Sequence, residues 1–113
     1  ISVFIIFSGA FRIGAFRTNS PIEAGEDLLM FTSIVNDGDK SLKDVRLSYI
    51  LFSDSFYDTI STSISDIDGE TNYGITSFYE TSELDEEEYF LKVSVNHNGN
   101  IRSRYVPIYV ITG

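Results

Sequence analysis

Acidic side chains offer the first candidate for chemistry in this chain. Asp66, Asp68 and Glu70 stand at alternate positions, the spacing with which calcium-binding loops present their carboxylate oxygens. The stretch lacks the remaining positions of an EF-hand loop. Two interpretations stay open: a solubilising loop, which is the commoner role of such acids, and a calcium site formed by these three residues.

Catalytic and cofactor-binding residues are not predicted. His97 is the only histidine, it is expected to be exposed beside a turn, and the chain has no cysteine. Neither a catalytic triad nor a zinc site of the usual composition can be built from that set. There is no glycine-rich phosphate loop and no GxSxG motif. We therefore expect a protein that is not an enzyme. Since tryptophan is absent, Tyr57, Tyr73 and Tyr79 are the candidates for stacking on a sugar ring, against their commoner role in sheet packing.

Composition and charge limit the classes of partner. The 113 residues include 17 acidic and 8 basic side chains, which gives a formal net charge of −9. This charge argues against nucleic acid, whose binding depends on neutralising phosphates, and against anionic lipid surfaces. Hydrophobic residues make up 42% of the chain, which is enough for one folded domain over residues 1–113.

Alternation of apolar and polar residues, rather than a helical period, runs through the chain and predicts strands. Asn98-Gly99 is the pair preferred in a two-residue hairpin turn. A change of phase in the last strand predicts a β-bulge near Tyr105–Pro107. The expected strands are a first strand kinked at Gly9, then 26–36, 43–52, a short edge strand within 56–63, 72–79, 89–95 and 101–111. Such a series favours an all-β, immunoglobulin-like sandwich of two antiparallel sheets with seven or eight strands.

The predicted core is the inward face of three of these strands. Strands 43–52 and 89–95 alternate cleanly, whereas 26–36 is apolar on both faces and is expected to be covered on both sides. The expected core residues are Leu29, Phe31, Val35, Val45, Leu47, Tyr49, Leu51, Tyr89, Leu91, Val93 and Val95.

The segment Ile1–Phe7 is apolar almost without interruption. It is too short to span a bilayer and lacks the basic start of a signal peptide. Two interpretations stay open: a first strand buried on both sides or continuing from a neighbouring domain, and a strand that leaves its own domain to complete a neighbour's sheet. The candidate assembly residues are Ile1, Val3, Phe4, Ile5, Ile6 and Phe7.

Three sequence motifs follow one another along the chain. Ala24-Gly25-Glu26 precedes a strand that ends in Ile34-Val-Asn-Asp-Gly38, and Tyr89-Phe-Leu-Lys-Val93 forms a late strand. In these motifs the chain resembles the cell-adhesion-related (CARDB-like) immunoglobulin-like domain of bacterial and archaeal surface proteins. The resemblance implies an extracellular module of adhesins, stalks or surface layers, with Tyr89 anchoring a corner, and it carries no catalytic residue.

The leading hypothesis is therefore a structural or adhesion module on the surface of a prokaryotic cell, with an archaeal one among the candidates. It would act as a spacer or as an assembly unit that polymerises into a filament or layer by strand addition. The expected partners are neighbouring copies of itself or adjacent domains of the same protein, without nucleic acid and without membrane insertion. The alternative is a glycan- or protein-binding module assisted by calcium, and no other cofactor is expected.

Overall fold

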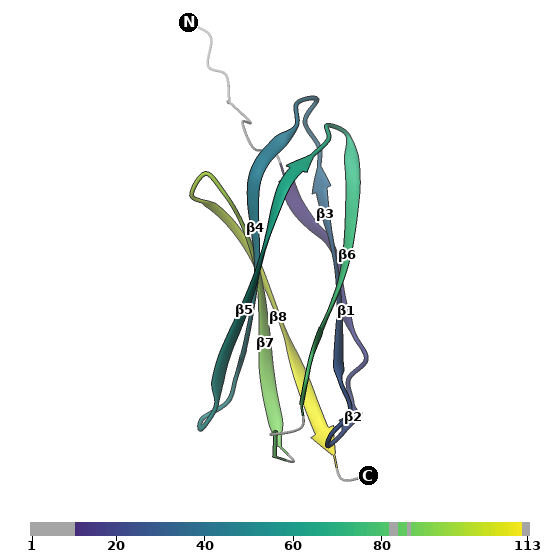
Figure 1. Cartoon of the computed structure of the whole chain (residues 1–113), viewed down its shortest axis with the longest axis vertical. Coiled ribbons are helices and arrows are strands. Elements are labelled where there is room, and N and C mark those ends of the chain that lie inside the picture. Colours follow the sequence, from purple (N-terminus) through teal and green to yellow (C-terminus); the bar gives the residue numbers. More distant parts are fainter. Residues whose placement is uncertain (1–10, 82–83, 86, 112–113) are drawn as a thin grey trace, which may run out of the picture.

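The computed structural model describes residues 11–81, 84–85 and 87–111. These residues form two facing sheets (Figure 1), so the predicted all-β, immunoglobulin-like sandwich is confirmed. The strands are β1 (Phe11–Thr18), β2 (Ile22–Glu23), β3 (Leu28–Asn36), β4 (Leu42–Phe52), β5 (Tyr57–Ile67), β6 (Thr71–Tyr79), β7 (Glu88–His97) and β8 (Asn100–Ile111). No helix in this part of the chain is long and apolar enough to cross a membrane.

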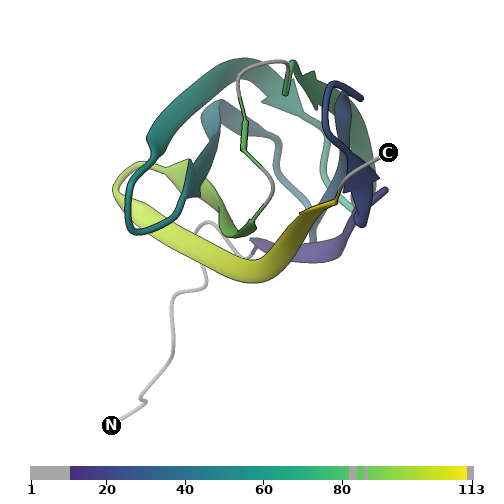
Figure 2. The same cartoon turned by 90° about the horizontal axis from the view of Figure 1, so that it is seen from below.

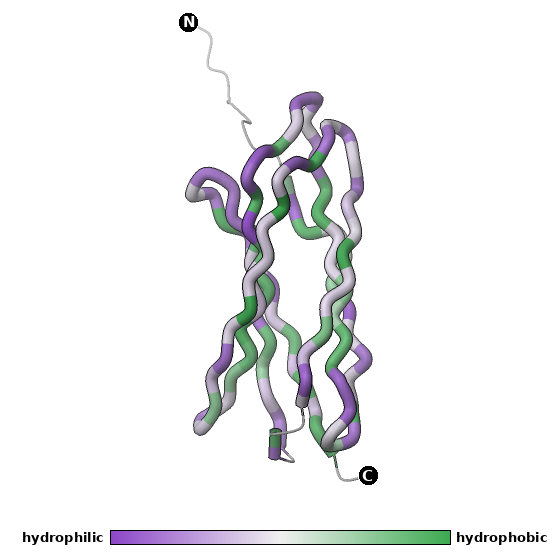
Figure 3. The backbone as a smooth tube through the Cα atoms, in the orientation of Figure 1, coloured by the Kyte–Doolittle hydropathy of each residue, from purple (hydrophilic) through white to green (hydrophobic). Residues whose placement is uncertain are grey.

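The smaller sheet has the strand order β1-β3-β6, and the larger has the order β2-β8-β7-β4-β5. All pairings are antiparallel except the short parallel one between β2 and β8. Seen along the long axis, the strands surround the core as a ring (Figure 2). Hydrophobic residues recur along the strands and hydrophilic ones gather in the turns at the upper end of the molecule (Figure 3).

The core lies between the two sheets. The expected residues of β4 and β7 are buried: Val45, Leu47, Tyr49, Leu51, Tyr89, Leu91, Val93 and Val95. The antiparallel register places Leu47 opposite Val95, and Leu51 opposite Leu91. Each such side chain contributes about 1.5–3 kcal/mol by leaving water. These two central strands therefore fix which face of the larger sheet is inside.

The predicted inner face of β3 is wrong. Leu29 is 46% exposed, and Phe31 and Val35 are half-buried on the outward face. The buried inward residues are Leu28, Met30, Thr32, Ile34 and Asn36, and on the outward face of β3 only Ser33 is buried. Because both faces of the strand carry apolar residues, hydropathy alone could not decide between them. The inner face carries a polar residue that has its own partner, since the hydroxyls of Thr32 and Tyr49 are hydrogen-bonded at 2.5 Å.

The bulge predicted near Tyr105–Pro107 is also wrong. The β7–β8 register runs without a shift from His97–Asn100 to Glu88–Tyr109. Every second residue of β8 therefore faces the same way as the buried Ile108 and Val110. This inward-facing series includes Val106 and the two arginines of the strand, Arg102 and Arg104. These cations are tolerated because every residue from Asn100 to Tyr105 is exposed. This half of the strand lies at the margin of the smaller sheet, where the Arg102 guanidinium packs over the Phe11 ring at 4.8 Å from its centroid.

Pro107 occupies an edge position in β8. The Tyr109 amide donates to Ser20 Oγ, and the Ile111 carbonyl accepts from the Ala24 amide. The main-chain groups of Tyr109 and Ile111 therefore point away from β7. Residue 107 lies two positions before Tyr109 in the strand, so its main-chain groups point the same way. The nitrogen of Pro107, which cannot donate, therefore lies where no partner in β7 requires a donor.

Three smaller features differ from or match the expectations. The expected kink at Gly9 lies outside the described residues, whereas the register of β1 against β3 shifts between Ile13 and Phe16. β5 is longer than the expected 56–63 segment. The Asn98-Gly99 hairpin turn is confirmed, because both residues have positive φ, 53° and 85°.

Candidate interaction surface

The candidate calcium residues lie around a structural turn. Asp66 is paired with the Lys43 ammonium at 3.3 Å. The Asp68 carbonyl accepts from an asparagine side chain, and the Glu70 amide donates to the Gly38 carbonyl at 2.8 Å. Within residues 11–81, 84–85 and 87–111, no three His, Cys, Asp or Glu side chains are grouped so as to hold a metal ion. The geometry therefore lends no support to a calcium site at these residues.

Asn36 holds two loops together at this end of the sandwich. It is 1% exposed, and its Nδ2 lies 2.8 Å from the Lys40 carbonyl, 3.2 Å from that of Ile67 and 3.1 Å from that of Asp68. Its Oδ1 accepts from the Gly38 amide at 3.0 Å. The β3–β4 and β5–β6 turns are thus fastened through one buried amide. The role of this asparagine is structural.

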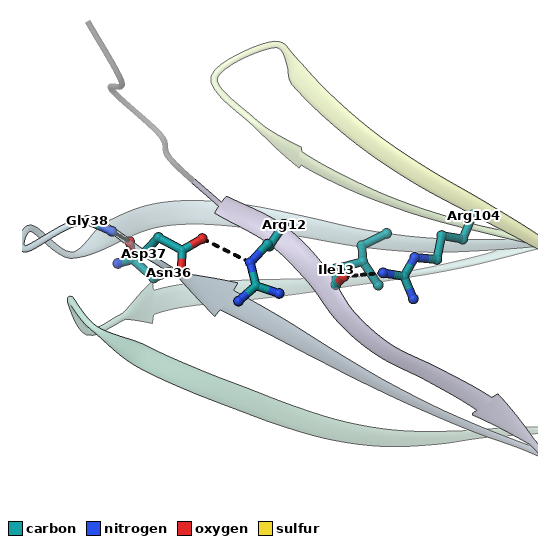
Figure 4. A network of polar contacts seen from close by, with 6 residues as sticks. All are labelled: Arg12, Ile13, Asn36, Asp37, Gly38 and Arg104. Atoms are coloured by element: carbon teal, nitrogen blue, oxygen red, sulfur yellow. Dashed lines mark hydrogen bonds and ion pairs between the residues drawn. The ribbon is translucent and has the colours of Figure 1, made fainter.

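Polar side chains join the two sheets along both margins of the sandwich. The Arg104 guanidinium of β8 donates to the Ile13 carbonyl of β1 at 2.6 Å (Figure 4). Nearby, Arg12 pairs with Asp37 at 3.0 Å. On the other side, the Tyr79 hydroxyl of β6 donates to Asp58 of β5 at 2.6 Å. The Arg104–Ile13 and Tyr79–Asp58 contacts connect strands that share no ladder, whereas Arg12 and Asp37 form an exposed ion pair within the smaller sheet.

His97 is not the exposed turn residue that the sequence predicts. It is 9% exposed, and its ring meets Phe11 edge-on at 6.0 Å between centroids. Its Nδ1 has no hydrogen-bond partner in the structure. Of the three tyrosines considered for sugar stacking, Tyr73 and Tyr79 pack partly buried against the core, and only Tyr57 is exposed, at 70%.

Exposed hydrophobic side chains concentrate on the outward face of the larger sheet. Among the described residues, eight large hydrophobic side chains are prominently exposed, and six of them lie on this face: Tyr57, Phe90, Ile101, Tyr105, Tyr109 and Ile111. Monomeric proteins rarely expose apolar residues together in this way, and such patches commonly mark contact sites. We call the outward side chains of β5, β4, β7 and β8 between the Tyr109 and Ile101 levels the aromatic face.

The register arranges this face in rows across the strands. Tyr57, Phe52, Phe90 and Pro107 are successive partners across β5, β4, β7 and β8, and form the aromatic row. The Phe52 and Phe90 rings lie 5.9 Å apart, tilted by 33°. Because neighbouring strands are about 4.8 Å apart, the row spans about 14 Å. Sequence reasoning missed the row because its members come from four separate strands.

Four residues before Phe52 in β4, the same register produces a row of serines. Ser61, Ser48, Ser94 and Ser103 follow one another across the four strands. Their hydroxyls bond to each other in pairs, at 3.1 Å between Ser48 and Ser61 and at 3.0 Å between Ser94 and Ser103. Because serine side chains are small, this row rises less above the sheet than the aromatic row does, and its hydroxyls have hydrogen-bond partners within the row. It lies about 14 Å from the aromatic row along the strands.

Charge on the aromatic face differs from charge on the whole chain. Its cations are Arg46 and Lys92, and the Lys92 ammonium lies over the Tyr105 ring at 5.6 Å from the centroid. Its one acid is Glu88, which accepts a hydrogen bond from Tyr109 and thereby raises the pKa of that phenol. Two positive charges and one negative give +1, against −9 for the chain.

A surface hollow of about 250 Å³ adjoins the aromatic row. Phe52, Phe90, Asp54, Glu87 and Glu88 are among its lining residues. Two aromatic rings and three carboxylates on one hollow make it suited to a cationic side chain with an apolar stem.

Comparisons with known proteins identify the type of fold that this chain adopts. No protein-family profile matches the chain, and no curated protein matches it in sequence. The CARDB domain of the PF1109 protein from Pyrococcus furiosus, solved in complex with di-metal ions, superposes with a TM-score of 0.63 at 11% identity, covering 91% of this chain and 94% of that one. The sporulation control protein Spo0M from Bacillus subtilis gives 0.59 at 9% identity, covering 91% of this chain and 50% of that one. At such low identity the likeness extends to architecture alone, and the chain is a β-sandwich with a CARDB-like fold.

Proposed function

We propose that this chain is a non-catalytic structural and adhesion module of a prokaryotic cell-surface protein, serving as a spacer or an assembly unit. Its CARDB-like fold supports this proposal. So does the arrangement of the strands, because the chain enters β1 at one end of the sandwich and leaves β8 at the other (Figure 1). Modules joined in this way extend a stalk by their full length.

The observation that carries the assembly role is the open edge of β5. This strand is the outer member of the larger sheet and pairs only with β4 among the described strands. Its 11 residues contain neither proline nor lysine, two of the residues with which natural sheets block an edge, and the one charge in its inward phase, Asp58, accepts a hydrogen bond from the Tyr79 hydroxyl. A long open edge accepts an added strand through its main-chain groups. The apolar segment Ile1–Phe7 of a neighbouring copy has the composition of a donor.

Substitutions within the full chain test strand addition. We expect Ile6→Asp to abolish polymers seen by negative-stain microscopy, because a buried carboxylate opposes insertion. Ser8→Asp adds the same charge just outside the segment and should polymerise like the unchanged protein. Thr62→Lys, which places an inward charge on the β5 edge, should also block assembly. Polymers that persist in Ile6→Asp, or an unchanged protein that never polymerises, would count against the proposal.

A second candidate function is glycan binding, favoured by the exposed tyrosines that share one face with a row of serine hydroxyls. Tyr57, Tyr105 and Tyr109 offer ring faces, and the serines offer hydrogen bonds. Calorimetry with a panel of neutral oligosaccharides, with and without calcium, tests this candidate. The absence of heat in both conditions would argue against it.

A further inference from the structure

We propose that Arg104, acting with a bulge in β1, closes the β1 edge of the smaller sheet to added strands. Strand addition is thereby confined to the opposite margin of the sandwich, where β5 lies. This inference rests on the proposed function for the identity of the added strand. The closure of the β1 edge is a property of the single chain, and it can be tested without that strand.

β1 and β5 are both long outer strands. Among the described strands, β1 pairs only with β3, and β5 pairs only with β4. Like β5, β1 contains neither proline nor lysine. Its arginines, Arg12 and Arg17, lie on the outward face, where the first pairs with Asp37 and the second packs over the Phe31 ring. Composition therefore does not explain why one edge would accept a strand and the other would not.

The β1 edge is interrupted by a bulge. The register of β1 against β3 gains one residue between Ile13 and Phe16, so that Gly14 and Ala15 together face Ser33. The Ala15 amide donates to Ser33 Oγ at 2.7 Å, which fixes the extra residue in place. A Cβ at residue 14 would lie 2.7 Å from the same oxygen, so the position favours glycine. A bulge of this kind bends the edge and breaks the regular spacing that an added strand needs.

The bulge also presents two consecutive main-chain oxygens to one side chain. In a regular strand, successive residues direct their carbonyls to opposite sides. Here the Arg104 guanidinium donates to the Ile13 carbonyl at 2.6 Å and to the Gly14 carbonyl at 3.4 Å (Figure 4). Its donors form a planar fork, which suits two neighbouring acceptors. Acceptors that an added strand would use for its own ladder are therefore already taken.

Arg104 obstructs the β8 edge on the same margin as well. It lies opposite Val93 in the β7–β8 ladder and belongs to the inward-facing series of β8. A strand inserted between β1 and β8 would cover this cation, and removing its charge from water is unfavourable. Further along β8, Ser20 Oγ accepts from the Tyr109 amide, and β2 pairs with the last two residues of the strand. Both edges on this margin are thus blocked.

The contact that crosses the opposite margin uses different groups. There the Tyr79 hydroxyl donates to the Asp58 carboxylate at 2.6 Å, so this bridge joins two side chains and takes no main-chain oxygen of β5. β5 also keeps a single register against β4 from Tyr57 to Ile64. A straight edge of this kind is the one to which an added strand can bond along its length.

The inference is tested in the full chain with β5 addition disabled twice, by Ile6→Asp in the apolar segment and Thr62→Lys on the edge. In this background an opened β1 edge can still pair with the β1 edge of another copy. We expect Arg104→Ala to self-associate at least about tenfold more strongly than the background protein in sedimentation velocity, because two main-chain acceptors become free.

Arg102→Ala in the same background is the matched control. It removes the same charge from the same face of β8, but the Arg102 guanidinium packs over the Phe11 ring and not on the bulge. Its self-association should equal that of the background protein. Arg104→Gln, which loses the charge but keeps most of the stem, replaces Arg104→Ala if circular dichroism shows that variant unfolded, and it should also associate more strongly than the control.

Hydrogen exchange locates the new contact. In the associated Arg104 variant, the amides of β1 should gain protection, while those of β5 should not. A folded Arg104 variant that associates no more than Arg102→Ala, or one whose new protection lies outside β1, overturns the inference.

These outcomes are separate from those of the proposed function. If the unchanged chain never polymerises, addition at β5 fails, and the comparison of Arg104→Ala with Arg102→Ala still decides whether the β1 edge is closed. If the unchanged chain polymerises and Arg104→Ala stays monomeric in the disabled background, the inference alone fails.

Discussion

The inner face of β3 can be tested with one chemical change made at two adjacent positions. Leu28 is 0% exposed, and Leu29 is 46% exposed on the opposite face. Leu28→Ala leaves a cavity in the core and should destabilise the domain by about 2–5 kcal/mol. Leu29→Ala removes the same atoms from a half-wet position. Since full burial of a leucine is worth about 1.5–3 kcal/mol, the loss there should be about 1 kcal/mol or less.

Urea denaturation followed by circular dichroism measures this difference. With a slope of about 1–3 kcal/mol/M, the midpoint of Leu28→Ala should fall by about 1–2 M while that of Leu29→Ala moves little. The slopes should stay equal, which shows that stability and not compactness has changed. Equal losses in the two variants, or a greater loss in Leu29→Ala, would refute the assigned face of β3.

Three further outcomes are expected. Tyr89 is buried and its hydroxyl donates to the Asp85 carbonyl at 2.9 Å, so Tyr89→Phe should cost about 1 kcal/mol at neutral pH by thermal unfolding. Burial and nearby acids raise the pKa of Tyr89 to about 12, so its advantage over Tyr89→Phe should be full below about pH 10 and decline as the pH rises towards 12; a pH-independent difference would contradict this. Asn36→Ala leaves buried carbonyls without a donor and should cost at least about 2 kcal/mol in urea unfolding, whereas a neutral effect would show that water replaces the amide. Gly14→Val should cost about 1–3 kcal/mol, because an added Cβ would lie 2.7 Å from Ser33 Oγ, and unchanged stability would mean that the strand shifts freely.

Much of the fold could be predicted because two strands have only one plausible inner face. In β4 and β7, polar residues alternate with apolar ones, so Leu47 and Val93 had to face the core. The sequence of β3 does not distinguish its two faces, since the adjacent Leu28 and Leu29 lie on opposite faces and are chemically identical. Its orientation depends on what the neighbouring strands cover, and that is tertiary information.

The error in β8 has a related cause. The apolar Ile101 and Tyr105 suggested an inward phase that the structure gives instead to Arg102 and Arg104. Hydropathy predicts facing only where a second sheet buries the strand, and this half lies at the margin of the smaller sheet, where its residues stay exposed. The aromatic face could not be predicted for another reason, because its rows exist only once the register of four strands is known.

The opposite placement of Phe11 and Ile111 has a mechanical consequence. A pull applied between these two positions acts along β1 and β8, which run in the same direction from one end of the sandwich to the other (Figure 1). Their ladders with β3 and β7 are then loaded in shear, so that many hydrogen bonds resist together instead of opening one at a time. The Arg104 contact with the Ile13 carbonyl ties the two loaded strands to each other. Forced unfolding is governed by the unfolding rate, and we expect this geometry to slow unfolding under tension.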